Sequence, residues 1–196
     1  MRNVLKIALI GFAFFSTGTC LSQVKYEREY RIKKDTIAEN ACVFIHQSEF
    51  LEEKTRVKWY REESEDGTST EAKFKQNVKR YSIEFDETGK LQDVELEIDE
   101  SEIPVETMKK ISVILERNFD RWKIKKVQRQ WIGSEIEVIE SINKEYAADG
   151  VEENFEIVIK GKVGNEKNYY ELLFDQTGEL MRQQRIVEQS SDILIF

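Results

Sequence analysis

Apolar and polar residues alternate along residues 81–91, and the same pattern recurs along residues 170–180. The two stretches share Tyr, Phe, Asp, Thr, Gly and Leu at equivalent positions. Alternation with a period of two is typical of a strand with one buried face. The shared Asp-x-Thr-Gly supplies a turn between two strands, so each stretch is predicted to form a β-hairpin. We therefore predict one structural unit that occurs twice in the chain.

The first unit is predicted to span residues 23–99 and to contain a helix followed by four strands. A short strand near Tyr30 precedes the helix, which is capped by Asp35 or Thr36 and runs to about Leu51. The period-two pattern then places strands at 55–64, around Ala72 and Phe74, at 81–85 and at 91–98.

The last of these strands carries two kinds of residue in strict alternation. Its apolar set is Val94, Leu96 and Ile98, and its acidic set is Asp93, Glu95, Glu97 and Asp99. A period of two puts the sets on opposite faces of the sheet. We expect the apolar face to lie in the core and the acidic face to lie in solvent, where it is not a catalytic pair. The acidic face could hold calcium weakly, but no Asp-x-Asp-x-Asp-Gly loop indicates a dedicated calcium site.

The second unit is predicted to span residues 100–196 and to repeat the order of the first. Pro104 lies in the first turn of a helix whose apolar stripe runs from Met108 to Trp122. Strands at 124–132 and 155–159, a loop at 161–167 and the hairpin at 169–187 follow.

An insertion at about residues 134–150 distinguishes the second unit from the first. Ser134 and Glu137 form a capping-box pattern, and isoleucines follow at helical spacing, so the insertion is predicted to carry a short helix. Long structured insertions are often functional, and the alternative is that this one covers a sheet edge.

Together these elements predict an α+β fold. Tandem helix-plus-four-strand units are expected to form one antiparallel sheet of about eight strands, with the helices on one face.

Residues 1–22 are expected to be a signal peptide rather than part of the fold. Arg2 and Lys6 precede the apolar run 7–15, which is too short to span a bilayer, and small residues precede a cut between Ser22 and Gln23. Lipid attachment at Cys20 is the alternative, although Thr17 stands where a lipobox has an aliphatic residue. We therefore expect export to the periplasm or the extracellular space, with no transmembrane segment in the mature chain.

The mature chain would be acidic. The full chain of 196 residues has a net charge of −8, and cleavage leaves 28 basic and 38 acidic residues, a net charge of −10. Because phosphate binding needs a basic surface, a nucleic-acid partner is not expected. Cleavage also leaves one cysteine, Cys42, so no intrachain disulfide can form.

Several segments resemble the PepSY-like, β-lactamase-inhibitor-like (BLIP-like) family of secreted bacterial proteins. They are Val57-Lys-Trp-Tyr60, Glu71-Ala-Lys-Phe74, residues 79–90, Phe155-Glu-Ile-Val-Ile-Lys160 and residues 170–180. The resemblance covers most of residues 30–188 and implies a curved antiparallel sheet with helices on one face. It also implies action by protein binding, although most members of this branch have no assigned activity and the inhibitor's disulfides have no counterpart here.

Residues that could carry catalysis are few. The chain has one histidine, His46, four positions after Cys42 on the first predicted helix. A catalytic or metal site needs further partners, and none is evident, so we expect structural roles for both residues. We therefore predict no catalytic, cofactor-binding or metal-binding residues, no cofactor and no enzymatic activity.

The exposed face of the sheet is the predicted interaction surface. If Val57 and Trp59 face the helix, the opposite face carries a polar surface with one tyrosine. Its candidate interface residues are Arg56, Lys58, Tyr60, Lys73, Lys75 and Glu84, with Ser82 beside them. The predicted function is an exported protein-binding module, in one form an inhibitor or modulator of an envelope or secreted enzyme. The alternative is a periplasmic protein that binds a small ligand or carbohydrate.

Overall fold

The computed structural model describes residues 23–47, 51–52, 54–64 and 67–188. The predicted signal peptide, including Cys20 and Ser22, lies outside these residues. The described part of the chain contains nine strands, three α-helices and two short 3-10 helices. The strands are β1 (Gln23–Arg31), β2 (Lys58–Ser64), β3 (Gly67–Gln76), β4 (Lys79–Phe85), β5 (Leu91–Glu97), β6 (Arg121–Ile132), β7 (Glu152–Val163), β8 (Glu166–Asp175) and β9 (Leu180–Glu188). The helices are η1 (Lys34–Thr36), α1 (Glu39–Gln47), η2 (Glu100–Glu102), α2 (Val105–Asn118) and α3 (Glu135–Lys144).

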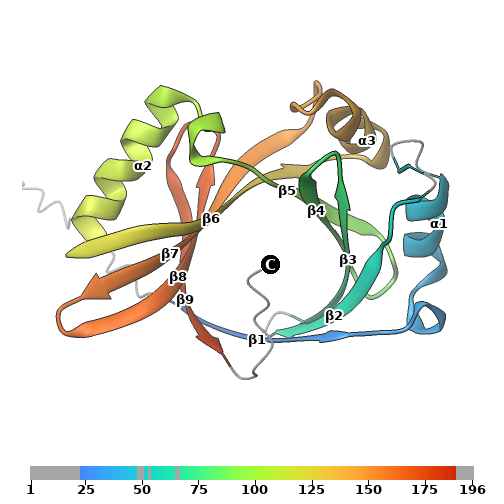
Figure 1. Cartoon of the computed structure of the whole chain (residues 1–196), viewed down its shortest axis with the longest axis horizontal. Helices are drawn as coiled ribbons and strands as arrows, with labels where there is room; N and C mark the ends of the chain where they lie inside the picture. Colours follow the sequence, from blue (N-terminus) through green and yellow to red (C-terminus); the bar gives the residue numbers. More distant parts are fainter. Residues whose placement is uncertain (1–22, 48–50, 53, 65–66, 189–196) are drawn as a thin grey trace, which may run out of the picture.

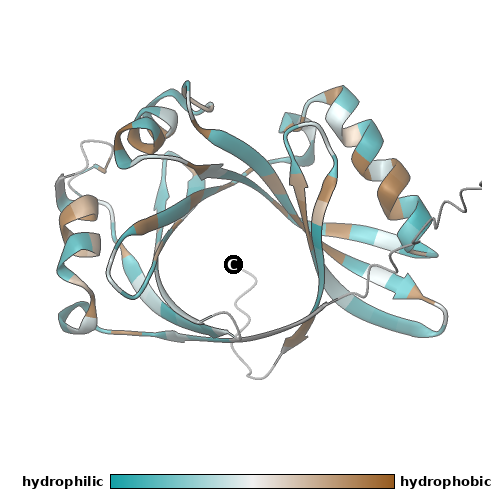
Figure 2. Ribbon diagram, turned by 180° about the vertical axis from the view of Figure 1, so that it is seen from behind, coloured by the Kyte–Doolittle hydropathy of each residue, from teal (hydrophilic) through white to brown (hydrophobic). Residues whose placement is uncertain are grey.

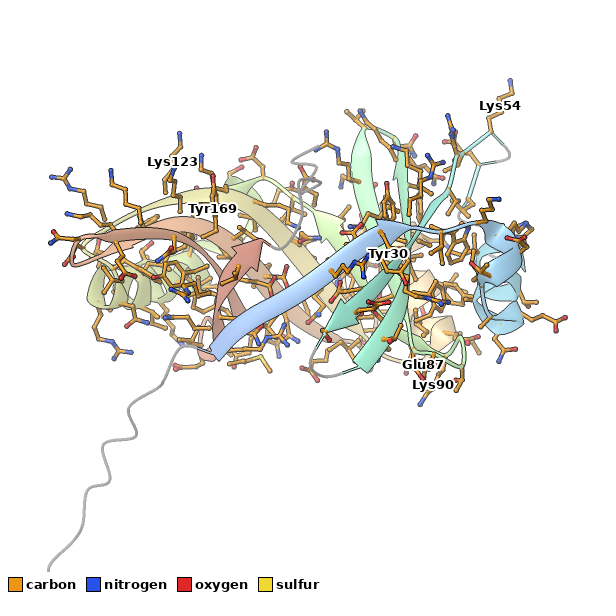
Figure 3. The ribbon with its side chains drawn as sticks, turned by 90° about the horizontal axis from the view of Figure 1, so that it is seen from below. Tyr30, Lys54, Glu87, Lys90, Lys123 and Tyr169 are labelled. Carbon is orange, nitrogen blue, oxygen red and sulfur yellow. The ribbon has the colours of Figure 1, made fainter. Side chains whose placement is uncertain are left out.

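The nine strands form one closed barrel in the order of the sequence (Figure 1). Consecutive strands are antiparallel neighbours, and the barrel is closed by parallel pairing of β1 with β9, from Gln23 opposite Gln184 to Glu27 opposite Glu188. Figure 3 shows β1 crossing the molecule from the side of β9 to the side of α1. The α+β class agrees with the prediction. The sheet has nine strands rather than about eight, because the short strand predicted near Tyr30 joins it as β1 and pairs with both β2 and β9.

All three α-helices lie outside the ring of strands (Figure 1). Hydrophobic segments occur on the helices and on the strands that they cover (Figure 2). On the α1 side, the Phe44 ring meets the Phe85 ring edge-on at 5.6 Å between centroids. On the α2 side, Phe119 packs against Tyr170 at 4.8 Å. The core therefore lies between the helices and the outer face of the sheet.

Each of the two repeated turns is closed by an aspartate. Asp86 Oδ1 accepts hydrogen bonds from the Thr88 and Lys90 amides, and Asp175 Oδ1 accepts the equivalent bonds from Thr177 and Glu179. The strands on both sides are paired as β4–β5 and β8–β9, so both predicted hairpins are confirmed. The description of the chain as two tandem units stays a prediction.

The glycines of these turns lie close to two different helices. Gly89 has a φ of +81°, and a Cβ at this position would lie 3.0 Å from the Ala41 backbone nitrogen. Gly178 has a φ of +86°, and a Cβ there would lie 2.8 Å from the Thr107 carbonyl oxygen. Each of the two positions therefore requires glycine for two reasons: the backbone has a positive φ, and a helix lies too close for a Cβ atom.

Other elements differ from the predictions in their bounds. The helix α2 ends at Asn118, so Trp122 belongs to β6 rather than to the helical stripe. The predicted loop 161–167 is a tight turn between the long strands β7 and β8. The predicted helix in the insertion is confirmed as α3, with the capping box of Ser134 and Glu137 formed on both sides.

No helix within the described ranges combines the length and the apolarity that crossing a membrane requires.

Candidate functional site

The inner face of the closed sheet is polar. Because apolar residues point outward to the helices, the alternate residues on each strand point into the barrel. Strand register joins these residues into rows that run around the ring. One row is Tyr60, Glu71, Glu84 and Asp93, and the next is Lys58, Lys73, Ser82, Glu95, Gln130 and Asn154. A third row joins Glu97, Gln128, Glu156, Leu173 and Arg182. We call this surface the inner face.

Two carboxyl groups of the inner face are held by glutamine amides. Gln130 Nε2 donates to Asp93 Oδ2 at 2.9 Å, and Gln128 Nε2 donates to Glu95 Oε2 at 2.5 Å. Burial, together with the negative charge of the neighbouring Asp93, raises the pKa of Glu95 to about 8. Burial, with Glu84 and Glu156 nearby, raises the pKa of Asp93 well above its ordinary value. The predicted solvated acidic face was therefore wrong for these two residues, which point into the barrel.

The other two acidic residues of that alternating set lie elsewhere. Glu97 pairs with Arg80 at 3.1 Å, and Asp99 caps the short helix η2. The acidic residues of β5 thus do not act as one stripe.

Lys73 is the centre of a second group on the inner face. Its Nζ lies 2.9 Å from Glu29 Oε2 and 2.8 Å from Glu71 Oε2. It also lies 5.2 Å from the centre of the Tyr60 ring, and Ser82 Oγ donates to Glu71. Burial alone would lower the pKa of Lys73, but the carboxylates of Glu71 and Glu29 raise it. Glu29 belongs to β1, so this group connects the closing strand to β3.

Three buried side-chain acceptors have no hydrogen-bond partner among the described residues. They are Gln128 Oε1, Asn154 Oδ1 and Gln184 Oε1. Gln128 is 6% exposed and Gln184 is 8% exposed, so both are buried. A buried acceptor without a donor is costly, so these oxygens are places where a ligand or water can donate.

The structure separates the six candidate interface residues. Lys58, Tyr60, Lys73 and Glu84 are on the inner face, whereas Arg56 and Lys75 are exposed. Tyr60 is only 8% exposed, so its predicted exposure was wrong. The physical reason is closure: an open sheet would present this face to solvent, whereas β1 and β9 fold it inward. A role of these residues in an interface stays a prediction.

The sequence prediction missed several members of the inner face. They include Gln128, Gln130, Asn154, Glu156, Glu171 and Gln184. The signal was present, because these polar residues alternate with buried apolar ones such as Trp131, Phe155 and Ile157. This alternation was interpreted as a solvent-exposed face, because the polar face of an antiparallel sheet is ordinarily in solvent.

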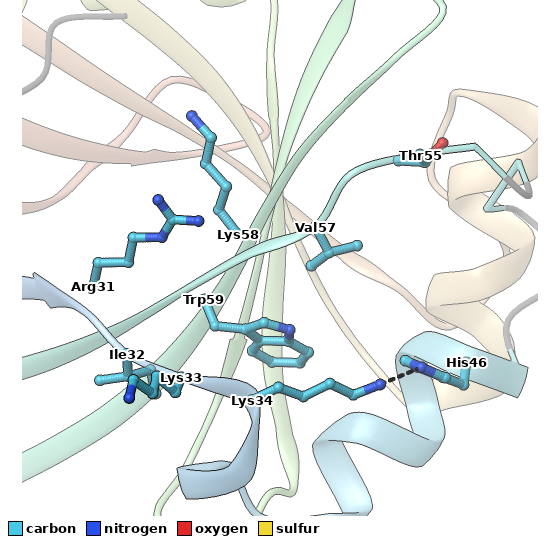
Figure 4. A pocket seen from close by; sticks show the side chains of 9 residues that line it. All are labelled: Arg31, Ile32, Lys33, Lys34, His46, Thr55, Val57, Lys58 and Trp59. Atoms are coloured by element: carbon cyan, nitrogen blue, oxygen red, sulfur yellow. Dashed lines mark hydrogen bonds between the residues drawn. The ribbon is translucent and has the colours of Figure 1, made fainter.

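A separate cavity of about 660 Å³, the corner pocket, lies where β1 leaves the sheet and the chain turns toward α1 (Figure 4). Its nine lining residues are Arg31, Ile32, Lys33, Lys34, His46, Thr55, Val57, Lys58 and Trp59. Lys34 Nζ lies 2.6 Å from His46 Nε2, so the imidazole accepts a hydrogen bond from the ammonium group. Cys42, on the same helix, is half-buried.

Within the described ranges, no three Asp, Glu, His or Cys side chains come together closely enough to hold a metal ion.

Comparison with known proteins supports the fold. No protein-family model matches the chain, and no curated protein does. A solved structure of a DUF2874 family protein from Bacteroides ovatus matches with a TM-score of 0.50 and 14% identity, covering 80% of this chain and 92% of the other. A BLIP-like protein from Bacteroides fragilis matches with a TM-score of 0.46 and 13% identity, covering 79% and 89%.

A third match is a protein of Bacteroides eggerthii that is provisionally described as periplasmic. It has a TM-score of 0.49 and 13% identity, and the match covers 76% of this chain and 89% of the other. The structures similar to this chain thus include a protein described as BLIP-like and a DUF2874 family protein. At these identities the likeness concerns the fold alone.

Proposed function

We propose that the chain is an exported, non-enzymatic binding protein that holds a small, hydroxyl-rich ligand, such as a carbohydrate, on the inner face. The observation that supports this proposal is that buried acceptors without a partner lie on the same face as the protonated carboxyl group of Glu95. Gln128 Oε1 and Gln184 Oε1 can each accept a hydrogen bond. With its pKa raised to about 8, Glu95 keeps its proton at neutral pH and can donate one. A hydroxyl group both donates and accepts, so it suits such a surface.

The non-enzymatic part of the proposal rests on the placement of the reactive residues. His46, the one histidine of the sequence, lies on α1 outside the ring of strands, and so does Cys42. The inner carboxyl groups of Asp93 and Glu95 are bonded to the amides of Gln130 and Gln128. Nucleophilic catalysis needs a nucleophile and a base within hydrogen-bond reach, and the Ser82 hydroxyl does contact the Glu71 carboxylate on the inner face. That carboxylate, however, is already paired with Lys73. Export is proposed from the signal-peptide pattern of residues 1–22.

The test is calorimetric titration of residues 23–196 with a panel of neutral mono- and oligosaccharides. The informative variant is Gln128→Met, which keeps the volume of the side chain and removes its amide. The matched control is Gln92→Met, an exposed glutamine on the neighbouring strand β5. We expect a sugar to bind and Gln128→Met to weaken it about tenfold or more, because one lost hydrogen bond costs on the order of 1.4 kcal/mol.

Three results would contradict the proposal. If no sugar binds, the unpartnered acceptors are satisfied by water. Equal affinity of Gln128→Met and wild type would place the ligand elsewhere. Turnover of a glycoside that is lost in Glu95→Gln would make the protein an enzyme, since paired carboxyl groups are the catalysts of glycoside hydrolysis.

A second candidate function is protein binding through the insertion, in one form inhibition or modulation of an envelope or secreted enzyme. The observation that favours it is the exposure of two large side chains of the insertion, Ile136 in the first turn of α3 at 80% and Tyr146, two residues after α3, at 57%. Exposed aromatic and aliphatic residues are common anchors of protein interfaces. A pull-down of residues 23–196 from the native envelope fraction tests it, with Ile136→Ser/Tyr146→Ser and Arg56/Lys58/Tyr60 triple-alanine variants. Capture of one protein that only the insertion variant loses would support this function, and capture lost only by the triple variant would return the interface to the sequence-predicted residues.

A further inference from the structure

The strands β6, β7 and β8 extend beyond the closed ring at one end of the molecule. Residues 121–126 of β6 pair with β7 but not with β5, and β8 begins three residues before its pairing with β9. At about 3.3 Å per residue, the part of β6 that lacks β5 is about 20 Å long. Figure 1 shows this projection beside the end of α2. We call residues 121–126, 158–163 and 166–169 the three-stranded tip.

Positive charge is concentrated in the three-stranded tip. Its sequence has seven basic residues and one acidic residue, Glu166. The tip therefore carries a net charge of +6, and the rest of the chain, whose total is −8, carries −14. Such a separation of charge attracts an anionic partner to one end of the molecule and repels it from the rest.

Five of these basic residues share one side of the tip with a tyrosine. Strand register arranges the six in two rows, which are Arg121, Lys162 and Lys167 in one and Lys123, Lys160 and Tyr169 in the other. Residues opposite each other on neighbouring strands point to the same side, and so do residues two positions apart on one strand. The other side of the tip is covered by Phe119 at the end of α2, so the six point away from that helix. Figure 3 shows Lys123 and Tyr169 on the same side. We call the six residues the basic face.

The charge of the basic face is not neutralised by other residues in the described part of the chain. None of its five cations contacts a carboxylate there. Lys160 lies 5.6 Å from the centre of the Tyr169 ring, a cation–aromatic contact that leaves the charge in place. By contrast, Lys73 and Lys79 each contact a carboxylate at 2.8 Å. Like charges directly opposite on neighbouring strands destabilise a sheet, and an anionic partner would remove this repulsion.

Protection of the sheet edge explains only part of this arrangement. Basic residues on an edge strand prevent a second chain from pairing with it, and Arg121 and Lys123 lie on such an edge. Lys160 and Lys162 lie on β7, which pairs with β6 on one side and with β8 on the other. Their charge protects no edge and therefore indicates a partner.

The basic face suits an extended anionic surface rather than one small anion. Its two rows lie about 7 Å apart and cross three strands, about 10 Å in all, so the charges are spread out. Four of the five cations are lysines, which act as hydrated point charges, whereas arginine is the residue that binds a single phosphate or carboxylate through paired hydrogen bonds. Tyr169 is half-buried, and tyrosine rings commonly lie at the level of lipid headgroups.

We propose that the basic face binds the surface of an anionic phospholipid membrane. Its five cations lie against the lipid phosphates, and Tyr169 lies among them. The projection of about 20 Å exceeds the Debye length of about 8 Å at physiological ionic strength, so repulsion between the membrane and the acidic remainder of the chain is screened. This proposal does not depend on the function proposed for the inner face, because a protein that binds no sugar can still bind a membrane through the tip.

The test is sedimentation of residues 23–196 with lipid vesicles. Vesicles of phosphatidylglycerol and phosphatidylcholine in equal parts present an anionic surface, and vesicles of phosphatidylcholine alone present a neutral one. The variant is Lys123→Gln/Lys160→Gln, which removes two charges from the basic face. The matched control is Lys54→Gln/Lys90→Gln, which changes two exposed lysines outside the tip and alters the net charge equally (Figure 3). Soluble polygalacturonate and a DNA duplex serve as the other polyanions.

We expect the chain to bind the anionic vesicles and to be released at about 1 M salt, where the Debye length falls to about 3 Å. Each lysine near an anionic surface contributes about fivefold in affinity, so Lys123→Gln/Lys160→Gln should bind about 25-fold more weakly than wild type. The control should stay within about twofold of wild type. The melting temperature of Lys123→Gln/Lys160→Gln should not fall, because the variant removes like charges, and this excludes unfolding as the cause of weaker binding.

The proposal is overturned if the anionic vesicles are not bound, if neutral vesicles are bound equally well, or if the two double variants lose the same affinity. Binding of polygalacturonate or of the DNA duplex without binding of the anionic vesicles would assign the basic face to a polysaccharide or to a nucleic acid, and would also overturn it.

Discussion

The side-chain amide of Gln128 on β6 donates a hydrogen bond of 2.5 Å to Glu95 Oε2 on β5, inside the closed sheet. The carbonyl oxygen of the same amide has no partner in the described part of the chain. Gln128 therefore fixes one oxygen of a buried carboxyl group and offers a free acceptor beside it. This pair connects the stability of the barrel to pH and also defines the place where we expect a hydroxyl group to bind.

Stability should fall as the pH rises through the neutral range. The pKa of Glu95 rises from 4.5 to about 8 in the folded protein, so the folded state holds a proton that the unfolded chain releases above pH 4.5. The free energy of unfolding then decreases from about pH 4.5 to about pH 8. Glu95→Gln cannot titrate and should remove at least about 1 kcal/mol of this decrease, or ~2–4 °C in Tm.

Thermal denaturation of both proteins between pH 4.5 and pH 8.5 measures this difference. Glu87→Gln, which changes an exposed turn residue, is the control and should follow wild type. If Tm depends on pH in the same way for wild type and Glu95→Gln, Glu95 is ionised at neutral pH. It could then not donate a hydrogen bond to a ligand, which would contradict the proposed ligand site.

The turn glycine at 178 should be far less replaceable than a turn glycine in open space. In Gly178→Ala the new Cβ would lie 2.8 Å from the Thr107 carbonyl oxygen, so the turn and α2 must separate. We expect a loss of more than about 2 kcal/mol, from the clash together with the strain of a positive φ. Gly164→Ala also has a positive φ, +60°, but has no atom within 4 Å, and should lose only about 1 kcal/mol. Urea denaturation measures the free energy of unfolding of both variants. Equal decreases would show that the turn at Gly178 does not pack closely against α2.

Lys73 should hold the closing strand in place. In Lys73→Gln the carboxylates of Glu29 and Glu71 lose the cation that both contact within 3 Å. We expect the amides of residues 29–31 in β1 to exchange hydrogen several-fold faster, because local opening of this strand becomes easier by about 1 kcal/mol. Lys75→Gln, two residues further along β3 and exposed, is the matched control. Unchanged exchange in Lys73→Gln would mean that backbone pairing alone closes the barrel.

The two faces of α2 should respond differently to truncation. Leu115 is fully buried, so Leu115→Ala should cost about 2–5 kcal/mol through lost burial and the cavity left behind. Val113, two residues away on the same helix, is 64% exposed, and Val113→Ala should change stability by less than about 0.5 kcal/mol. The free energies of unfolding of the two variants test whether the outer face of the sheet packs against this side of α2. A large loss in Val113→Ala would instead indicate that the exposed side of α2 is covered in solution.

The local pattern of the sequence predicted the strands and their two faces well. Alternation around Ile83 and Leu172 placed these residues in the core, where both are fully buried. The capping box of Ser134 and Glu137 likewise predicted the start of α3. These features are set by residues within a few positions of one another, so sequence reasoning can reach them.

The end of α2 was missed because two patterns coincide there. Phe119 and Trp122 fit helical spacing, yet Phe119 has an extended backbone and packs against Tyr170. The Asp120 amide then donates to the Lys162 carbonyl oxygen and begins the pairing with β7. Contacts with residues 42 positions further along the chain, from Asp120 to Lys162, decide this boundary, and the local sequence does not contain them.

The closure of the sheet was missed for the same reason on a larger scale. The pairing of Gln23 with Gln184 joins the two ends of the described chain, and nothing near either residue indicates the other. The inward placement of Tyr60 and Lys73 depends on that pairing, so the candidate site was predicted as residues but not as a surface.

The parallel pairing of β1 with β9 has a consequence for the behaviour of the protein at high concentration. In the described structure every strand has a neighbour on each side over part of its length, so no strand offers a complete unpaired edge on which a second chain could add a strand. The start of β6, residues 121–126, pairs with β7 but not with β5. If β1 detached, β2 and β9 would each lose a neighbour and become edge strands with unpaired backbone groups. Self-association and fibre formation should therefore be governed by the closing strand rather than by the stability of the core.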